Sequence, residues 1–311
     1  MNRLPIATIL VNWNQTELTR ATIAALLVAG VAAETIWLAD NGSDGDPLAQ
    51  LQAAFPGVRL LRIGFNAGFA GGNNRAIRAA QADQPEAFFL LNTDALVEPG
   101  TIEALWRALV ADPGLAAVAP KVYYQASGRV IQSVGVTVDP ASGETRMLAS
   151  GEVDLGQHDQ PADRQALFGC ALLIRAAAWQ QVGELWEPFF MYAEEIDWCL
   201  RARRLGWRLG YVPEAVVWHH SGGSVGAGSA LKVYWLVRNR LWLRRRHHPG
   251  GVASLRGLAY TLALSLLVAL RYLRARQWRL AYAVWLGCWD YLLGRSGPQR
   301  RADLRLLAQD D

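Results

Sequence analysis

The sequence predicts an α/β protein with an open, doubly wound and largely parallel sheet, followed by a C-terminal region of helices. In the first half of the chain, short apolar runs alternate with stretches whose apolar residues have helical spacing. This alternation is typical of parallel strands joined by crossover helices. From about Leu231 onward the alternation gives way to long aliphatic and aromatic stretches, which predict helices that are not part of the sheet.

Four apolar runs predict the first four strands, and four helices are predicted between and after them. The strands are expected at residues 6–11, 35–39, 58–63 and 88–91. The helices are expected at residues 16–29, 47–54, 72–82 and 101–111. Pro99-Gly100 opens the last helix and Asp112-Pro113-Gly114 ends it. Together these elements form a nucleotide-binding half of the doubly wound type.

The pattern is less regular between residues 117 and 174, where short strands alternate with turns rich in Gly, Ser and Asp. The clearest strands are predicted at 130–138 and 166–174. A helix at 194–205 and a short last strand at 216–218 follow. The sheet region then ends in a loop of small residues, 219–224.

The C-terminal region contains two long apolar segments, each preceded by arginines. Residues 252–273 approach the length of a membrane span, and residues 280–293 contain Trp285 and Trp289 among aliphatic residues. Either the first segment spans a bilayer, or both are amphipathic helices that lie in the headgroup region. Arg256 inside the first segment and the shortness of the second favour the interfacial alternative.

Composition and charge narrow the class of protein. With 311 residues, 52% of them hydrophobic and 19% charged, the chain can build a large core and is not disordered. The formal net charge is +4, but the residues from Lys232 onward include 15 basic and 4 acidic ones, a net +11, which leaves −7 on the rest. A basic, Trp-rich tail on an acidic body indicates an anionic surface as partner. The aliphatic runs favour lipid over nucleic acid.

The cysteines and the N-terminal residues indicate the cellular compartment in which the protein folds. The three cysteines, Cys170, Cys199 and Cys288, are odd in number and widely spaced, which is typical of reduced thiols and fits no zinc motif. The first apolar run is too short for a signal peptide. We therefore expect the folded body to stay in the cytoplasm.

Polar residues follow each of the first four predicted strands. Because the carboxyl ends of parallel strands meet at one edge of a sheet, these loops are expected to converge on one ligand. The third loop also offers glycines and a helix N-terminus, which suit a phosphate. Each loop alone also fits a turn or a helix cap, and the Rossmann and P-loop fingerprints are absent from the sequence. The residues concerned are Asn12, Asn14, Asp40, Asn41, Asn66, Gly68, Gly72, Asn73, Asn92, Thr93 and Asp94.

Two further clusters lie later in the chain. Glu194 and Glu195 begin a predicted helix, where they either complement the helix macrodipole or serve as a general base pressed against a pocket wall by the apolar run 188–192. The local pattern favours the base. Asp197 stands four residues before Arg201 and is expected to pair with it.

The adjacent histidines His219 and His220 follow the last predicted strand. A histidine at a strand end is usually a packed or surface residue. Here the neighbouring Ser221 and Ser224 suggest instead a contact to phosphate or metal.

The order of these motifs resembles glycosyltransferase family 2, in the bacterial branch that is similar to rhamnosyltransferases of cell-envelope polysaccharide assembly. The resemblance extends over roughly residues 5–245, and the tail, with WLGCWDYLLGRSG at residues 285–297, is also similar to the C-terminal end of such proteins. The motifs are VNWN, LADNGSDGD, NAGFAGGNN, LLNTDALVEPG, FGCALLIR, FFMYAEEIDWCLR, VVWHHSGGS and YWLVRNRL.

This resemblance implies a GT-A fold and a division of the chain. Residues 1–230 would form the catalytic domain, with a nucleotide-binding half at 1–115 and an acceptor half at 116–230, and residues 231–311 would associate with the membrane. The implied reaction is inverting transfer of a sugar, plausibly rhamnose or another deoxyhexose, with a carboxylate base and a divalent metal, Mg²⁺ or Mn²⁺. The implied donor is a dTDP- or UDP-sugar, and the implied acceptor is a lipid-linked glycan at the cytoplasmic face of the inner membrane.

The resemblance also implies roles for single residues in the nucleotide and metal sites. Asp40 would contact the nucleobase, and the regions of Asn12 and Asn66 would line the nucleotide cleft. Asp94 and His219 would hold the metal.

The resemblance further implies a base and a basic contact. Glu195 would be the base, with Glu194 as second choice, and Arg238 would reach the diphosphate or anchor the membrane-facing helix.

Two departures from the family pattern are visible in the sequence. Asn92 stands where the family often has the first Asp of Asp-x-Asp, which weakens the charge of the metal site. Glu195 stands where the family pair has Asp. A catalytically silent nucleotide-sugar-binding or scaffold protein is therefore the alternative.

Overall fold

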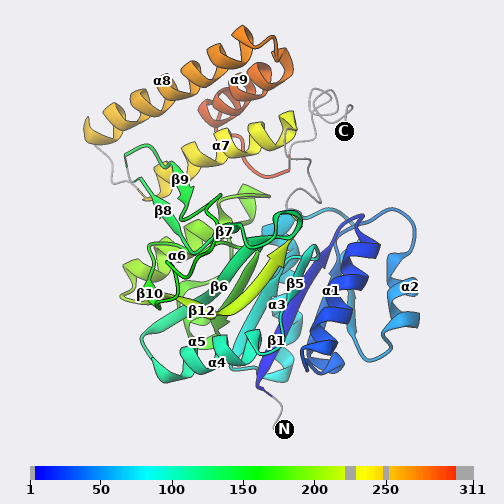
Figure 1. The fold of residues 1–311 in the computed structure, drawn as a ribbon. Coiled ribbons are helices and arrows are strands. Elements are labelled where there is room, and N and C mark those ends of the chain that lie inside the picture. The colour runs from blue at the N-terminus through cyan, green and yellow to red at the C-terminus, as the bar shows by residue number, and fades with distance from the viewer. Residues whose placement is uncertain (1–3, 140, 221–228, 248–251, 299–311) are drawn as a thin grey trace.

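A computed structural model of the chain describes residues 4–139, 141–220, 229–247 and 252–298 (Figure 1). One large sheet forms the centre, with the strand order β10-β12-β6-β11-β4-β1-β2-β3. Its strands in that order are β10 (Ala162–Asp163), β12 (Arg208–His219), β6 (Leu115–Tyr124), β11 (Ala171–Arg175), β4 (Ala87–Leu91), β1 (Ile6–Asn12), β2 (Ile36–Asp40) and β3 (Arg59–Arg62). Ser221 and Ser224, which the sequence analysis considered, lie outside the described residues.

The predicted α/β class and its mixed sheet are confirmed. Strands β1 to β4 pair in parallel, β11 runs antiparallel between β4 and β6, and β6 and β12 are parallel. The short strands β5 (Ala95–Val97) and β7 (Ile131–Ser133) pair with β12 and β6, while β8 (Val136–Val138) and β9 (Thr145–Met147) form a separate hairpin.

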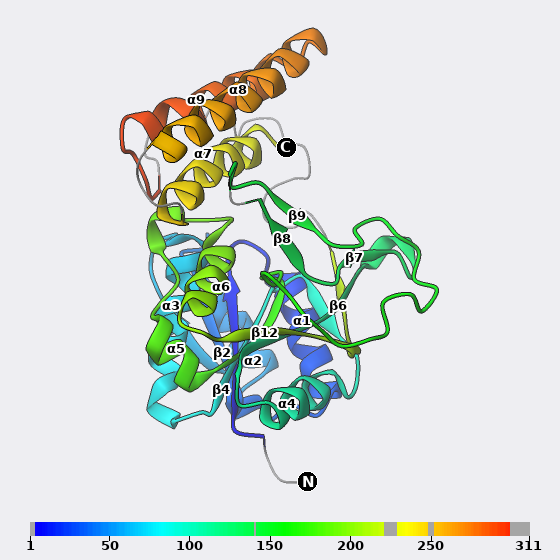
Figure 2. The ribbon, with the colours of Figure 1, turned by 90° about the vertical axis from the view of Figure 1, so that its left-hand side faces the viewer.

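Helices cover both faces of the sheet, so its central strands are apolar on both sides. Alternate residues of β4 fill two cores: Phe88 and Leu90 face one, and Phe89 and Leu91 face the other. The first core is covered by helices α3, α5 and α6, which Figure 2 shows together on one side, and the second by α1, α2 and α4. Their bounds are α1 (Thr16–Val28), α2 (Pro47–Ala54), α3 (Gly68–Ala80), α4 (Thr101–Ala111), α5 (Ala176–Val182) and α6 (Glu194–Arg204).

Most predicted elements of the first half are confirmed to within two residues, but α3 begins four residues earlier than predicted. It starts at Gly68 instead of residue 72. Glycines disfavour a helix in water, yet here Gly72 lies against Val11 of β1, where a side chain would clash. Tertiary packing therefore overrides the local propensity.

The second half contains two long strands that the sequence pattern did not reveal. β6 is a ten-residue strand, and β12 extends over 12 residues where only 216–218 were predicted. Pro213 interrupts β12, and the register against β6 shifts between Val212 and Val216, as expected of a bulge at a proline. Lys121 lies buried in the middle of β6 and pairs with Asp154 and Asp159 of a later loop. A buried charge with partners more than 30 residues away cannot be read from local periodicity.

Two other strand predictions are corrected. The predicted strand at 130–138 is divided into β7 and β8, because Gly135 has a φ of +133° and turns the chain between them. The predicted strand at 166–174 is a strand only from Ala171.

Three helices, α7 (Ala230–His247), α8 (Val252–Arg274) and α9 (Trp278–Leu292), confirm the helical C-terminal region. Figure 1 shows them stacked over the end of the sheet away from the N-terminus, which is the end where β1 finishes. The predicted pair of Asp197 and Arg201 is confirmed, with an N–O distance of 2.8 Å. The same carboxylate also binds Arg246 and His247 of α7, which ties α6 to the helical region.

The packing of β4 leads to a stability prediction. Phe89→Ala should lower the free energy of unfolding by about 3–5 kcal/mol, because the ring is fully buried between β4 and its helices. Phe65→Ala is the matched control, since that ring is 56% exposed, and should cost less than about 1 kcal/mol. Urea unfolding of both variants measures the difference, and equal losses would contradict the assigned core.

Candidate functional site at the carboxyl edge of the sheet

The topology gathers the predicted loops at one edge. β1 and β2 end side by side, since their register pairs Asn12 with Asp40. β12 reaches the same edge antiparallel to β5, and its register pairs His219 with Ala95, the residue after Asp94. Residues 125 positions apart in the sequence are thereby brought into contact.

The first corner of the site is a buried polar network around Asn12. Its amide nitrogen donates to Oδ1 of Asp40 at 3.3 Å and to Oγ of Ser43 at 3.2 Å, and its oxygen accepts from Thr19 at 2.9 Å. Asn14 follows in the left-handed region, with a φ of 54°. The network fixes the carboxylate of Asp40 at the end of β2, where a ligand at the edge can meet it.

The second corner is the start of α3. The side chain of Asn41 accepts from the amide of Ala67 at 2.9 Å and donates to Oδ1 of Asn66 at 3.2 Å, and Asn66 in turn accepts from the amide of Gly68. Gly68 has a φ of +75°, and a Cβ there would collide with the carbonyl oxygen of Phe190. Only glycine at position 68 therefore allows residues 188–192, the segment before Glu194 and Glu195, to approach the start of α3 this closely.

Two predicted members of this loop are placed differently. Gly72 and Asn73 lie inside α3, and the amide of Asn73 donates to the carbonyl of Phe69 in its own helix at 2.9 Å. Both are buried behind the edge. Both residues are therefore packed inside the helix and do not lie in the loop, where the sequence placed them.

The third corner contains Asp94 and His219, the predicted metal ligands. Nε2 of His219 lies 3.1 Å from Oδ1 of Asp94 and 3.2 Å from the amide nitrogen of Asn92. Nδ1 lies 2.9 Å from Oε1 of Gln132, an arrangement in which Nδ1 donates its proton and the ring is oriented from behind. Asn92 therefore faces this corner.

The charge state of His219 follows from its neighbours. Burial opposes the imidazolium, but Cys170 and the carboxylate of Asp94 favour it and raise the pKa of His219 to about 10. A metal bound at this corner would take the place of a proton on Nε2.

The pair lies at hydrogen-bond distance, which is also a distance that two ligands of one metal can have. Two adjacent ligands of an octahedral ion with bonds of about 2.1 Å lie about 3 Å apart, close to the observed separation of Nε2 and Oδ1. Among the described residues, no cluster of three or more His, Cys, Asp or Glu side chains could hold a metal. A metal held here would depend on ligand oxygens and water for its remaining positions. His220 contributes only its backbone amide, to the carbonyl of Asp94, and its side chain is exposed.

The fourth corner is the acidic pair at the start of α6. Glu194 is 3% exposed, and burial together with the charge of Glu195 raises its pKa well above the usual value. Oε2 of Glu194 is buried without a hydrogen-bond partner. Burial also raises the pKa of Glu195, while backbone N–H groups, that of Gly169 among them, favour its carboxylate. A Cβ on Gly169 would lie 3.0 Å from Cγ of Glu195, so the glycine makes room for this side chain.

Tyr192 is affected by the charges of the last two corners, and the sequence indicated it only as part of the apolar run 188–192. Burial and the nearby charges of Glu194, Asp94 and Glu195 raise its pKa to about 12. The acids of α6 and the acid after β4 therefore act on the same phenol. Tyr192 and Gly169 belong to the motifs FFMYAEEIDWCLR and FGCALLIR, which could have indicated them, whereas Gln132 carries no local sequence signal.

Arg238 was expected either to reach the diphosphate or to anchor the membrane-facing helix, and its contacts fit the anchor. Its side chain is fully buried, and its donors bind the carbonyl oxygens of Pro188, Phe189 and Gly297. The guanidinium therefore anchors α7 to the body, and the structure corrects the expectation that it faces the diphosphate.

Thr93 supports the loop between β4 and β5 from its backbone. Its carbonyl accepts from Thr22 at 2.9 Å, and its hydroxyl lies 3.5 Å from the side chain of Gln15. Thr93 is thus part of the loop that presents Asp94.

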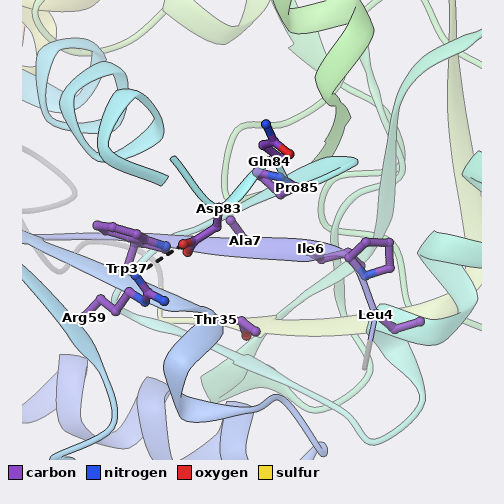
Figure 3. A pocket seen from close by; sticks show the side chains of 10 residues that line it. Leu4, Ile6, Ala7, Thr35, Trp37, Arg59, Asp83, Gln84 and Pro85 are labelled. Atoms are coloured by element: carbon purple, nitrogen blue, oxygen red, sulfur yellow. Dashed lines mark ion pairs between the residues drawn. The ribbon is translucent and has the colours of Figure 1, made fainter. Parts of the chain in front are cut away.

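A hollow of about 430 Å³ lies elsewhere on the sheet (Figure 3). It is lined by residues near the amino ends of the first two strands, including Ile6 and Trp37, and by Arg59, which pairs with Asp83 at 3.3 Å. This is the edge opposite the four corners, and its charges are already paired. Strand topology, which governs where ligands meet open α/β sheets, favours the carboxyl edge.

Comparisons with known proteins show the family to which the chain belongs. Residues 4–240 match the family described as Glycosyltransferase like family 2. A Mycobacterium tuberculosis protein named N-acetylglucosaminyl-diphospho-decaprenol L-rhamnosyltransferase is 32% identical over 235 residues, 67% of this chain and 73% of the relative. The Haloferax volcanii protein named low-salt glycan biosynthesis hexosyltransferase Agl10 is 25% identical over 219 residues, 68% and 67% of the two chains.

Solved structures share the GT-A fold. The mannosyltransferase PcManGT from Pyrobaculum calidifontis, in complex with GDP-Man and Mn²⁺, superposes with a TM-score of 0.57 at 14% identity, covering 94% of this chain and 88% of that one. GalNAc-T7 with UDP, GalNAc and Mn²⁺ gives a TM-score of 0.55 at 15% identity, with 69% and 42% of the two chains covered. At these identities the likeness concerns the fold alone.

The contact between Asn92 and His219 generates a prediction about the metal. Asn92→Asp should tighten Mn²⁺ binding in the absence of nucleotide by about ten-fold, because it adds a carboxylate beside the pair. Isothermal titration of the nucleotide-free protein measures the affinity, with His219→Ala as the variant that should lose it. An Asn92→Asp protein with the affinity of the wild type would show that this corner does not bind the metal.

Proposed function

The chain belongs to glycosyltransferase family 2 and is a glycosyltransferase, and we propose that it moves a sugar from a nucleotide-sugar donor to a lipid-linked glycan acceptor by an inverting, metal-dependent reaction. One observation carries this proposal. Asp94 with His219, the start of α6 with Glu194 and Glu195, and Asp40 all lie at the carboxyl edge of the sheet, and the charges of Asp94, Glu194 and Glu195 all raise the pKa of Tyr192. We therefore propose that a nucleotide site, a metal site and a base at this edge serve one donor.

The proposed donor is dTDP-L-rhamnose, with other dTDP- or UDP-sugars as the wider class. The mycobacterial relative is named for transfer of L-rhamnose to N-acetylglucosaminyl-diphospho-decaprenol, and it is 32% identical over 235 residues, 67% of this chain. We propose a polyprenyl-diphosphate glycan as the acceptor on the same ground. The nucleobase would meet Asp40 and the network of Asn12, and the diphosphate would lie between the start of α3 and Asp94.

In the proposed reaction, the acceptor hydroxyl oxygen forms a bond to the anomeric carbon of the sugar. The bond from that carbon to the diphosphate oxygen breaks, and its electron pair leaves with the nucleoside diphosphate. The carboxylate of Glu195 takes the hydroxyl proton. Glu195 suits this role better than Glu194, because backbone N–H groups favour its ionised form while Glu194 is buried and its pKa is raised further.

The second requirement is a counter-charge for the leaving group. Asp94 and His219 would hold a divalent metal, which when bound neutralises charge on the departing diphosphate. Asn92 leaves this corner with one carboxylate only, so we propose that metal and donor bind together.

The C-terminal helices support association with a membrane. α8 and α9 pack against each other, and α9 packs against α7. Their outer surface includes Leu266, Leu267 and Trp285, each more than half exposed. Of the described helices, α8 alone is long and apolar enough to cross a bilayer, and only 17% of its apolar window is buried.

We propose that α8 and α9 lie in the headgroup region at the cytoplasmic face of the inner membrane. Their packing onto α7 favours helices that lie beside the body over one that leaves it. Because α7–α9 stack over the carboxyl edge, a lipid-linked acceptor would then be close to the site (Figure 1). A spanning α8 is the alternative.

The central catalytic assignment is tested with Glu195→Gln. This variant should lose sugar transfer by at least about 100-fold, since it cannot accept the acceptor proton, while dTDP-rhamnose binding stays within about two-fold of the wild type. Transfer is followed by mass spectrometry of the glycolipid product, and binding by thermal shift. A Glu195→Gln enzyme that transfers sugar normally would assign the base elsewhere, and a wild type that transfers none would favour the silent scaffold.

The membrane assignment is tested with an aromatic pair on α9. Trp285 and Trp289 stack with their centroids 5.8 Å apart and are both exposed. Changing both to Asp should weaken binding to liposomes that contain phosphatidylglycerol by about ten-fold or more, because apolar surface no longer enters the interface. Val28→Asp, on the exposed face of α1, is the control and should bind like the wild type. Flotation measures the bound fraction, and equal binding of all three proteins would contradict docking through α9.

A further inference from the structure

We propose that Arg238 and Asn239, adjacent residues of α7, are positioning residues of the transfer reaction. They hold the backbone of residues 188–192 in the conformation that aims Glu194 and Glu195 at the site. This inference rests on the proposed function, in which that acidic pair supplies the base. It adds a contribution from the C-terminal helices to the chemistry of the sheet edge.

The segment before the acidic pair has an uncommon backbone. Phe190, Tyr192 and Ala193 have φ values of 68°, 69° and 78°, in the left-handed region that side chains other than glycine rarely adopt. Three such residues within four positions are costly, and a conformation of this kind persists only where its surroundings impose it. Residues 188–193 lead directly into Glu194, the first residue of α6. The path of this backbone therefore sets the direction in which α6 and its first two carboxylates begin.

Asn239 supplies most of the constraint. Its side chain is fully buried, and its amide nitrogen lies 3.0 Å from the carbonyl oxygen of Phe189, 2.7 Å from that of Met191 and 2.9 Å from that of Tyr192. One amide group therefore faces three carbonyls of four consecutive residues. Such a gathering of carbonyl oxygens requires the left-handed turns, and the amide stabilises it.

Arg238 completes the clamp. Its guanidinium donates to the carbonyls of Pro188 at 3.1 Å and Phe189 at 2.9 Å, and also to Oδ1 of Asn239 at 2.9 Å. The last bond orients the amide, so that its nitrogen faces the segment. The same guanidinium lies over the ring of Trp235, with 4.4 Å between Cζ and the ring centroid, and Trp235 stacks on Phe190. Side chain and backbone of the segment are thus both held by α7.

The opposite side of the segment is fixed by the nucleotide-binding half. The carbonyl of Phe190 packs against Gly68 at the start of α3. Residues 188–192 therefore lie between α3 and α7, and they cannot shift without losing contacts on both sides. If the clamp is released, the acids remain in the chain but their distance to Asp94 changes.

Asn239→Ala tests the inference, with Tyr234→Phe as the matched control. Tyr234 is on the same helix, is fully buried and donates a hydrogen bond to Asp290 at 2.8 Å. The centroid of its ring lies 5.6 Å from Cζ of Arg238, and Phe keeps this ring contact while it removes the hydroxyl. Asn239→Ala should lower kcat for transfer from dTDP-rhamnose to a polyprenyl-diphosphate N-acetylglucosamine by about ten- to 100-fold, since small misplacements of a base have effects of this size. Its affinity for the donor should stay within about two-fold. Tyr234→Phe should keep kcat within about two-fold.

A second readout separates positioning from general destabilisation. The pH profile of kcat/KM should shift in Asn239→Ala, because the base loses its arrangement relative to its N–H donors, and it should not shift in Tyr234→Phe. Asn239→Ser, which keeps one donor, should give an intermediate kcat, and it serves in place of Asn239→Ala if that variant does not fold. Unchanged kcat and pH profile in both Asn239 variants, or a loss of kcat matched by an equal loss of donor binding, would overturn the inference.

Amide hydrogen exchange distinguishes this inference from the proposed function. Exchange in residues 189–196 should be faster in Asn239→Ala than in the wild type and Tyr234→Phe. If the wild type transfers no sugar, the proposed function fails, whereas the exchange rates still report whether the clamp holds the segment. Exchange that is equal in all three proteins would overturn the clamp itself.

Discussion

The parallel pairing of β1 with β2 and with β4 is the constraint on which the rest of the molecule depends. It brings the polar residues that end these strands to one edge. β12 then returns to that edge and places His219 beside Asp94. The helices α3 and α6 begin at the same edge, and α7 to α9 stack above it (Figure 1). The loops proposed to bind the nucleotide, the acidic pair and the helices proposed to face lipid are therefore brought together by strand topology and not by closeness in the sequence.

Charge is concentrated at this edge at some cost to stability. The charges of Asp94, Glu194 and Glu195 all act on Tyr192, and burial raises the pKa values of the two glutamates. The three left-handed residues before Glu194 add backbone strain. Such costs are common where a site is pre-formed for a charged ligand, since a bound cation and diphosphate then find their partners in place. The clamp of α7 is one of the contacts that offset them.

The sequence revealed the fold where each strand had its own local signal. Strands β1 to β4 and the four helices that follow them were predicted from periodicity, and the ordered motifs predicted the family and the GT-A fold, which the comparisons confirm. β6 and most of β12 were missed, because buried Lys121 and the proline of β12 disturb the apolar pattern and are accommodated only by distant partners. The contact of Asp94 with His219 was expected through the resemblance. Gln132 could not be expected, since only tertiary structure brings it to His219.

We propose that the carboxyl edge forms one site in which Asp94 and His219 face the donor. Crystals grown with Mn²⁺ and dTDP-rhamnose test this by anomalous diffraction at the manganese edge. We expect one anomalous peak about 2.1–2.2 Å from Oδ1 of Asp94 and from Nε2 of His219, with the diphosphate bound to the same ion. A peak away from this pair, or donor bound at another edge of the sheet, would contradict it.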